Sequence, residues 1–141
     1  MNKKMLLFTL ILALAFVLAA CGGDGGGAAE GGGSSPVGDA AHGEELYNQV
    51  TIGSASAPGC VTCHSLEEGV VIVGPSHAGV ATRAATYVEG QSAEDYLRAS
   101  ILNPDEHIVD GYTAGVMYQN YAEELKASEV NDLVAYLLTL K

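Results

Sequence analysis

Three stretches of the chain space their apolar residues three and four positions apart, as one face of an amphipathic helix requires. They predict helices over residues 39–49, 92–103 and 128–138. The first helix has Leu46 and Tyr47 on its apolar face. The apolar positions of the other two are Leu97, Ile101 and Leu102 in the second, and Val130, Leu133, Val134, Tyr136, Leu137 and Leu138 in the third.

The ends of these helices carry capping residues. Asp39 can accept hydrogen bonds from the free N–H groups of a first turn. Ser92 and Asp95 begin the second helix as a capping box, with Asp in the position where Glu is more common. Asn103-Pro104 ends that helix, because the residue before a proline avoids helical backbone angles.

No segment alternates apolar and polar residues convincingly enough to predict a strand. The run of residues 69–74 is short and bounded by glycines, which does not indicate a sheet. Residues 48–59 are rich in Gly, Ser and Ala, and we interpret them as an Ω-like surface loop or a contact for a partner. With a short additional helix over 121–126, the pattern predicts an all-α domain of about three to five helices.

The N-terminus has the pattern of an export signal. Met-Asn-Lys-Lys precedes an apolar stretch that ends in small residues, as in a secretory signal peptide over residues 1–20. The stretch is too short to span a bilayer comfortably. Residues 18–21, Leu-Ala-Ala-Cys, resemble a bacterial lipobox, which implies cleavage before Cys21 and attachment of diacylglycerol to its sulfur. Ordinary secretion with an idle thiol is the alternative.

A glycine-rich stretch separates this signal from the rest of the chain. Residues 22–35 are almost entirely Gly, with Ala, Ser and two acids, a composition that cannot form a packed core and is typical of a flexible tether. A tether of this length reaches roughly 20 Å. Residues 21–35 are therefore predicted to be a lipidated Cys21 with its tether, and residues 36–141 one small domain.

Acidic side chains dominate the charge. The sequence has 17 Asp and Glu against 6 Lys and Arg. Loss of Lys3 and Lys4 with the signal leaves 4 − 17 = −13 in the mature chain. This balance argues against nucleic-acid binding and favours attraction of basic partners, although surface acids also serve solubility alone. His42 and His107 are interpreted as solvated side chains.

The run Cys60-Val61-Thr62-Cys63-His64 carries the most specific chemistry in the sequence. Cys-x-x-Cys-His is the attachment motif for a c-type haem. Thiols at this spacing can form thioethers with the two vinyl groups of one porphyrin, and the adjacent imidazole then faces the iron. A thioredoxin-like dithiol and half of a zinc site are the alternatives. The first does not need the adjacent His, and the second needs two further ligands at suitable spacing.

Four blocks of the sequence together resemble the class I c-type cytochromes, which are small monohaem electron carriers. The resemblance extends from residue 38 to residue 141 and keeps the order of the family. The blocks are Gly43 and Tyr47 in the first helix, the motif of residues 60–64, the Gly-Pro segment of residues 74–83, and residues 132–137 in the last helix. The resemblance implies a small cytochrome c fold wrapped around one covalently attached haem c.

The resemblance also assigns the groups that hold the haem. Cys60 and Cys63 would form the thioethers. His64 would ligate the iron on one side and Met117 on the other. Met117 is the only Met outside the signal, and it lies between the second and last helices, where the family places this ligand. The family usually has Pro after this Met, whereas Tyr118 stands there, which implies a less rigid loop and a more labile iron–sulfur bond.

Further roles follow from the same resemblance. The Pro75 carbonyl would accept the ring N–H of His64 and orient the imidazole. Arg83 would pair with a haem propionate, or serve as an ordinary surface cation. His77 stands where the family commonly has Leu, and would be a simple substitution near the haem or a reserve iron ligand.

These features predict a lipid-anchored electron carrier on the periplasmic or outer side of a bacterial cell membrane, with redox proteins of a respiratory or photosynthetic chain as partners. The glycine-rich start and residues 111–117 are similar to the monohaem cytochrome subunit of alternative complex III. The chain would then be a subunit of a quinol-oxidising membrane complex rather than a mobile carrier. The competing functions are a haem enzyme or gas sensor with an exchangeable sixth ligand, and a dithiol protein without haem.

Overall fold

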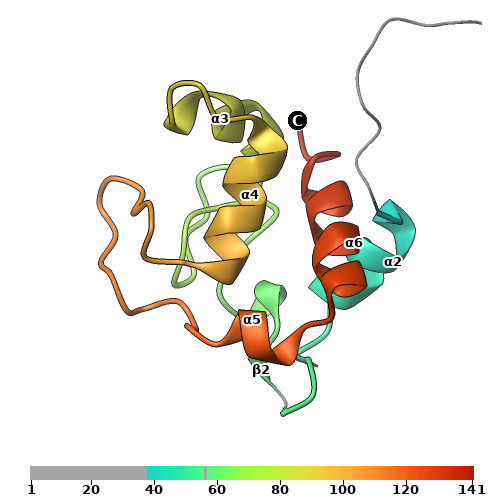
Figure 1. The fold of residues 1–141 in the computed structure, drawn as a ribbon. Coiled ribbons are helices and arrows are strands. Elements are labelled where there is room, and N and C mark those ends of the chain that lie inside the picture. The colour runs from blue at the N-terminus through green and yellow to red at the C-terminus, as the bar shows by residue number, and fades with distance from the viewer. Residues whose placement is uncertain (1–37, 56) are drawn as a thin grey trace, which may run out of the picture. The chain divides into compact units, whose positions relative to one another are not determined.

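A computed structural model describes residues 38–55 and 57–141 of the chain. Helices make up most of the regular structure in these residues, beside one small sheet of two antiparallel strands. The all-α class predicted from the sequence is confirmed. The elements, labelled as in Figure 1, are α2 (Ala40–Tyr47), β1 (Thr51–Ile52), β2 (Ala57–Pro58), the 3-10 turn η1 (Cys60–Thr62), α3 (Val80–Tyr87), α4 (Ala93–Leu102), α5 (Tyr121–Glu124) and α6 (Ala127–Leu137).

The predicted export and anchoring segments lie outside the described residues. These are the signal peptide of residues 1–20 and the lipidated Cys21 with its tether, residues 21–35, and they stay predictions. Within residues 38–55 and 57–141, no helix combines the length and the apolar character that crossing a bilayer requires.

The helix caps form as the sequence predicts. The Asp39 side chain accepts hydrogen bonds from the N–H groups of Ala41 and His42 at the start of α2. Ser92 Oγ accepts a hydrogen bond from the Asp95 N–H at 3.1 Å and donates one to the Asp95 carboxylate at 2.7 Å. These side chains satisfy N–H groups that the start of a helix leaves without partners.

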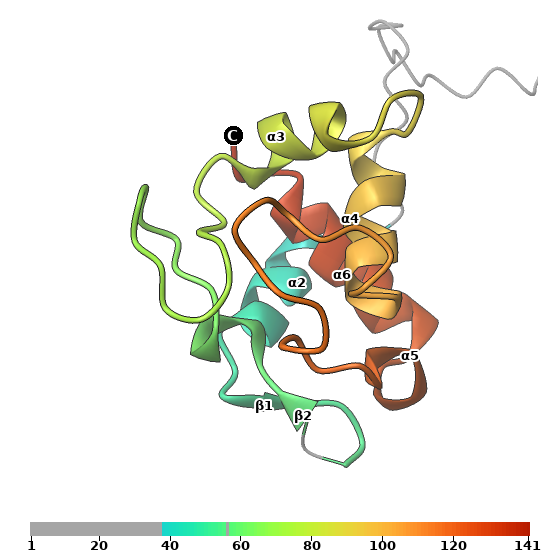
Figure 2. The ribbon, with the colours of Figure 1, turned by 90° about the vertical axis from the view of Figure 1, so that its left-hand side faces the viewer.

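The first and last helices of the domain cross at Gly43. A Cβ atom at this position would lie 1.9 Å from the backbone oxygen of Asp132, so only glycine fits between the two helix backbones. Beside the crossing, the rings of Tyr47 and Tyr136 pack with centroids 5.3 Å apart. Figures 1 and 2 show α2 lying against α6. This contact joins the two ends of the domain.

Asp132 also links α6 to the start of α2 through its side chain. Its carboxylate accepts hydrogen bonds from the Asp39 N–H and from His42 Nδ1, each at 2.7 Å. His42 was expected to be solvated, and it is exposed but paired. The hydrogen bond to Asp132 raises the pKa of His42, and the same bond lowers the pKa of Asp132.

The core lies between α2, α4 and α6 and consists of aliphatic and Tyr side chains. Its buried members are Leu46, Tyr47, Ile52, Ala57, Val80, Ala84, Tyr96, Leu97, Ile101, Tyr121, Leu125, Val130, Leu133, Val134, Tyr136 and Leu137. Cys60, Val61 and Met117 are partly buried and pack against this cluster. The core therefore extends to the Cys-x-x-Cys-His segment and to the loop that carries Met117.

Helix α3 was not among the predicted helices. Only Val80, Ala81 and Ala84 are buried in it, and the two alanines make its apolar face weak. Its N-cap residue, Gly79, provides no side-chain hydrogen bond, so the usual capping signal is missing as well. The helix forms because this small face packs against the domain, a tertiary effect that local periodicity does not reveal.

The loop predicted over residues 48–59 contains a small hairpin. Thr51 pairs with Pro58 and Ile52 with Ala57. Ile52 and Ala57 are both buried, so part of this segment belongs to the core. The expectation that no segment forms a strand was therefore wrong here. Two-residue strands are too short to produce an alternating pattern in a sequence.

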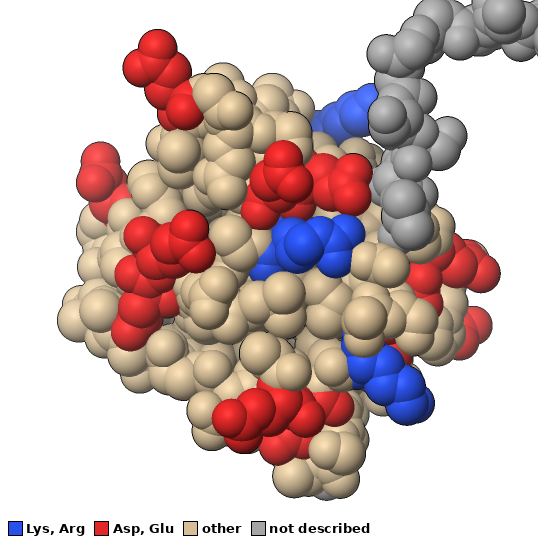
Figure 3. All heavy atoms as spheres, in the orientation of Figure 1, with Lys and Arg blue, Asp and Glu red and all other residues tan. Residues whose placement is uncertain are grey.

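Acidic residues cover much of the described surface. Residues 38–141 hold 15 Asp and Glu and 4 Lys and Arg, a charge of 4 − 15 = −11. Figure 3 shows red acidic groups spread over the face that it presents, with few blue basic ones between them. The folded domain therefore carries a strong negative charge of its own, apart from that of the predicted tether.

Candidate haem-binding site

The Cys-x-x-Cys-His segment forms one tight turn. The Cys60 carbonyl accepts hydrogen bonds from the N–H groups of Cys63, at 3.1 Å, and His64, at 2.9 Å. Thr62 Oγ1 donates to the Gly59 carbonyl at 2.6 Å. Cys60 and Cys63 are both free thiols of intermediate burial. The turn from Cys60 to His64, which begins with η1, thus gathers two thiols and an imidazole within five residues of sequence.

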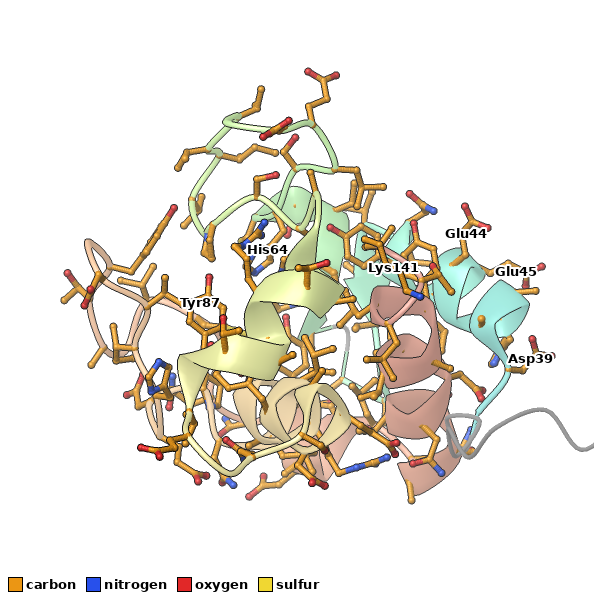
Figure 4. All side chains as sticks on the ribbon, turned by 90° about the horizontal axis from the view of Figure 1, so that it is seen from above. Asp39, Glu44, Glu45, His64, Tyr87 and Lys141 are labelled. Carbon is orange, nitrogen blue, oxygen red and sulfur yellow. The ribbon has the colours of Figure 1, made fainter. Side chains whose placement is uncertain are left out.

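His64 is buried and has a fixed ring orientation. Its Nδ1 lies 2.8 Å from the Pro75 carbonyl oxygen. A carbonyl can only accept, so Nδ1 carries the hydrogen and Nε2 holds a lone pair. Burial lowers the pKa of His64, against the opposing effect of the bond to Pro75, which favours the neutral imidazole. Figure 4 shows His64 inside the molecule, whereas Glu44 and Glu45 point outward from α2.

The segment after the motif closes over this ring. The Cys63 carbonyl accepts hydrogen bonds from the N–H groups of Val73, at 3.1 Å, and Gly74, at 2.9 Å. A Cβ atom on Gly74 would lie 2.4 Å from Cε1 of His64. The imidazole therefore occupies space that only a glycine leaves free, which fixes it between the turn and the Gly-Pro segment.

His77 covers the His64 ring with its own. The two imidazoles are stacked, with centroids 3.9 Å apart and planes 14° from parallel. Tyr47 Oη donates a hydrogen bond to the His64 carbonyl at 3.3 Å and lies 3.1 Å from His77 Nδ1, so His77 is the donor to Tyr47. Burial, and then the neighbouring His64 and Arg83, lower the pKa of His77 to about 3. His77 is thus a neutral, hydrogen-bonded part of the site.

Arg83 reaches back from α3 to the Gly-Pro segment. Its guanidinium donates to the Ala78 carbonyl at 2.5 Å and to the Ser76 carbonyl at 2.6 Å. The partly buried side chain stabilises the backbone that follows Pro75, so it is more than an ordinary surface cation. Its pairing with a haem propionate stays a prediction.

Met117 belongs to a different part of the chain. It lies in the loop between α4 and α5, partly buried against the core. Figure 2 shows this loop in orange on the face turned to the viewer, with the green segment after η1 at the left edge of the view. The next residue, Tyr118, packs edge-on against Tyr121 with ring centroids 5.1 Å apart.

The chemistry of these groups fits a c-type haem better than the alternatives. Burial raises the pKa of Cys60 to about 11, whereas thioredoxin-like pairs depend on a thiol with a lowered pKa. In the described part of the chain, no three His, Cys, Asp or Glu side chains are grouped so that they could hold a metal ion. The zinc alternative therefore finds no ligand set there. Two free thiols beside a neutral imidazole and an apolar core are what covalent attachment of a porphyrin needs.

Comparison with protein-family models matches the cytochrome c model over residues 40–141, most of the chain. The chain belongs to the cytochrome c family. A search of curated proteins gave no match. As a cytochrome c, the domain binds one haem c covalently and is an electron-transfer haem protein.

The cytochrome c fold brings together most of the residues that the sequence singled out. Cys60, Cys63, His64 and Pro75 are joined by direct hydrogen bonds, and Met117 packs on the same core. The sequence did not reveal the Gly74 contact, the stacking of His77 or the hydrogen bonds of Tyr47. The one signal in the sequence for these contacts was His77 within the Gly-Pro segment. The sequence did not show its stacking on His64, because that contact depends on the turn at Pro75.

Proposed function

We propose that this cytochrome c carries single electrons between redox proteins at the outer side of a bacterial membrane, to which a lipid on Cys21 anchors it. The observation that carries the proposal is the hydrogen bond from His64 Nδ1 to the Pro75 carbonyl at 2.8 Å. This bond leaves Nε2 as the nitrogen with a lone pair and holds the ring in one orientation, the arrangement that an axial haem ligand requires.

The roles of the side chains follow from their chemistry. Cys60 and Cys63 would form the two thioethers, and covalent attachment keeps the haem in place through repeated partner encounters. His64 and Met117 would be the axial ligands. The haem supplies reversible one-electron chemistry when bound, and a His/Met pair raises its reduction potential relative to harder ligands. Two filled axial positions leave no site for oxygen or peroxide, so catalysis is not expected.

Two further residues would act on the ligands and the haem edge. Pro75 would orient His64 and increase its basicity through the hydrogen bond to Nδ1. Arg83, with its guanidinium on the carbonyls of Ser76 and Ala78, would use its remaining N–H groups to pair with a propionate. A guanidinium offers five donors, so the two backbone bonds leave capacity for a third partner.

The sequence supports the proposed membrane anchoring. A lipid on Cys21 and the tether of residues 22–35 would let the domain move within roughly 20 Å of its anchor. The negative charge of the domain supports basic redox partners. A subunit of a quinol-oxidising complex, similar to the monohaem cytochrome subunit of alternative complex III, is the more specific form of the proposal.

Expression of the full chain and a Cys21→Ser variant in a bacterium that matures c-type cytochromes tests this function. The wild-type protein should fractionate with membranes and the variant with the soluble fraction. A quinol added to those membranes should reduce the haem of the anchored protein, and co-purification with the quinol-oxidising complex would identify a subunit. If added quinol does not reduce the haem, and the ferrous form binds carbon monoxide rapidly, the result would instead support an enzyme or gas sensor.

A further inference from the structure

Met117 lies in a long segment without a helix or strand, residues 103–120 between α4 and α5. Most residues of this loop from 110 to 116 are exposed, including Val116 at 58 %. A loop of this length loses much conformational entropy when one of its side chains must stay in a fixed place. A defined position for Met117 therefore needs contacts that hold the loop.

Asp105 and Gln119 provide such contacts on both sides of Met117. The Asp105 Oδ1 atom accepts a hydrogen bond from the Gly115 backbone N–H at 2.8 Å. The same oxygen accepts a second bond from Gln119 Nε2 at 3.3 Å. Gln119 Nε2 also donates to the Met117 carbonyl at 2.8 Å. One carboxylate oxygen thus joins the chain two residues before Met117 to the chain two residues after it.

The carboxylate at the centre of this network is itself held in place. Asp105 follows the buried Pro104 at the end of α4. The adjacent Glu106 donates its N–H to the Asn103 carbonyl at 2.9 Å in a turn. The position of Asp105 is therefore set by α4, and the hydrogen bonds transmit this position to the loop.

A second contact fixes the residue after Met117. Tyr118 Oη donates to Glu124 Oε1 at 3.3 Å. The other oxygen of Glu124 accepts from the Ala55 N–H at 2.6 Å and from Ser54 Oγ at 3.0 Å. The Met117 loop is thus joined to α5 and to the segment before the haem motif.

We propose that Asp105 and Gln119 are positioning residues for Met117, which hold its thioether in place before it meets the iron. The inference rests on the proposed ligation of the iron by Met117. A ligand whose loop is only partly in the binding conformation binds more weakly in proportion to that fraction. Hydrogen bonds that restrict the loop beforehand therefore strengthen the iron–sulfur bond.

The test compares haem-loaded full-length variants by two readouts. One is the weak long-wavelength absorption band of a ferric haem with a thioether ligand, and the other is carbon monoxide binding to the ferrous form. Asp105→Ala should weaken the band and raise carbon monoxide affinity about tenfold, because it removes two hydrogen bonds from the loop. Gln119→Ala should have a smaller effect in the same direction. Asp105→Asn should restore most of the band, since its amide oxygen can still accept.

Asp110→Ala is the matched control. It removes an exposed acid from the same loop but lies outside the hydrogen bonds around Met117, so it should behave as wild type. The inference is overturned if wild type has the band and Asp105→Ala keeps it, with carbon monoxide affinity equal to that of Asp110→Ala. A wild-type protein that lacks the band, or keeps it in Met117→Ala, would instead overturn the proposed ligation. Because Asp105 is exposed, the variant is expected to fold.

Discussion

The imidazole of His77 lies flat on that of His64, with ring centroids 3.9 Å apart. A hydrogen bond from His77 Nδ1 to Tyr47 Oη holds it there at 3.1 Å. The hydroxyl of Tyr47 in turn donates to the His64 carbonyl. Three contacts thus fix His64, the proposed axial ligand. Pro75 binds its ring nitrogen, His77 packs on its ring face, and Tyr47 binds its backbone carbonyl.

Substitutions of His77 and Tyr47 should lower the free energy of unfolding by different amounts. His77→Leu should lower the free energy of unfolding by about 1 kcal/mol, the usual contribution of a neutral hydrogen bond, because Leu keeps much of the apolar volume. Tyr47→Phe should cost more, about 1–3 kcal/mol, because it leaves the His77 N–H and the His64 carbonyl buried without their partner. Urea unfolding of the haem-loaded proteins measures both.

The double variant is the control for this prediction. Because the two side chains share one hydrogen bond, Tyr47→Phe with His77→Leu should cost less than the sum of the single changes. Costs that add fully would show that the two residues act independently, against the linked arrangement.

The His42–Asp132 pair predicts a pH dependence of stability. The raised pKa of His42 gives a contribution that is complete below its unfolded value of 6.5 and is lost as the pH rises through the folded value. The lowered pKa of Asp132 gives a contribution that is present above 3.8 and is lost as the pH falls through the folded value. The link between α2 and α6 should therefore be strongest between about pH 4 and pH 6.5.

His42→Ala should accordingly destabilise the protein more at about pH 5.5 than at about pH 8.5, as measured by urea unfolding at both values. In an Asp132→Asn background this difference should become smaller, because Asp132 has the largest effect on the pKa of His42, and only the weaker effects of Glu45 and Asp39 remain. An equal cost of His42→Ala at both pH values in the otherwise wild-type protein would refute the prediction.

Gly43→Ala should be among the most damaging single changes in the domain. Its Cβ would lie 1.9 Å from the Asp132 backbone oxygen, and neither helix backbone can move without loss of the α2–α6 contact. The expected cost is about 3 kcal/mol, the upper end of the range for overpacking. In contrast, a Cβ on Gly69 meets nothing within 4 Å, so Gly69→Ala should cost only about 1 kcal/mol, from its positive φ. Comparable midpoints of thermal unfolding for the two variants would contradict the close crossing.

The charge of −11 on residues 38–141 predicts opposite salt effects on two small reagents. Stopped-flow oxidation of the reduced protein by a cationic metal complex should slow as salt rises from about 10 mM to about 500 mM, because screening removes the attraction. Oxidation by an anionic complex should speed up over the same range. Salt effects of the same sign for both reagents would show that the surface charge does not steer the reaction.

Periodicity and capping predicted α2, α4 and α6, because each has a capped start or a broad apolar face. The short helix α5 was also expected, although it has no side-chain cap and buries only Tyr121. Helix α3 has neither, and depends on alanines that pack only once the domain has formed. The hairpin at Ile52 and Ala57 is too short to leave a pattern. These are tertiary effects, which local sequence does not encode.

In the candidate site, too, some features could be predicted from the sequence and others could not. Cys60, Cys63 and His64 are adjacent in the chain, so their spacing alone indicated the chemistry. The contacts of His77 with His64, and of Asp105 with Gly115 and Gln119, join residues 10 or more positions apart. They appear only when the turns at Pro75 and after α4 are in place, and neither leaves a motif in the sequence.

The most direct test of the account is the mass and colour of the purified mature protein after expression in a host that attaches haem to c-type cytochromes. We predict a coloured polypeptide that keeps its haem in a denaturing gel, with a mass greater than protein plus lipid by one haem. Replacing Cys60 and Cys63 together by Ser should abolish both properties. A colourless wild-type protein, with the mass of polypeptide and lipid alone, would contradict the covalent attachment of a haem to this chain.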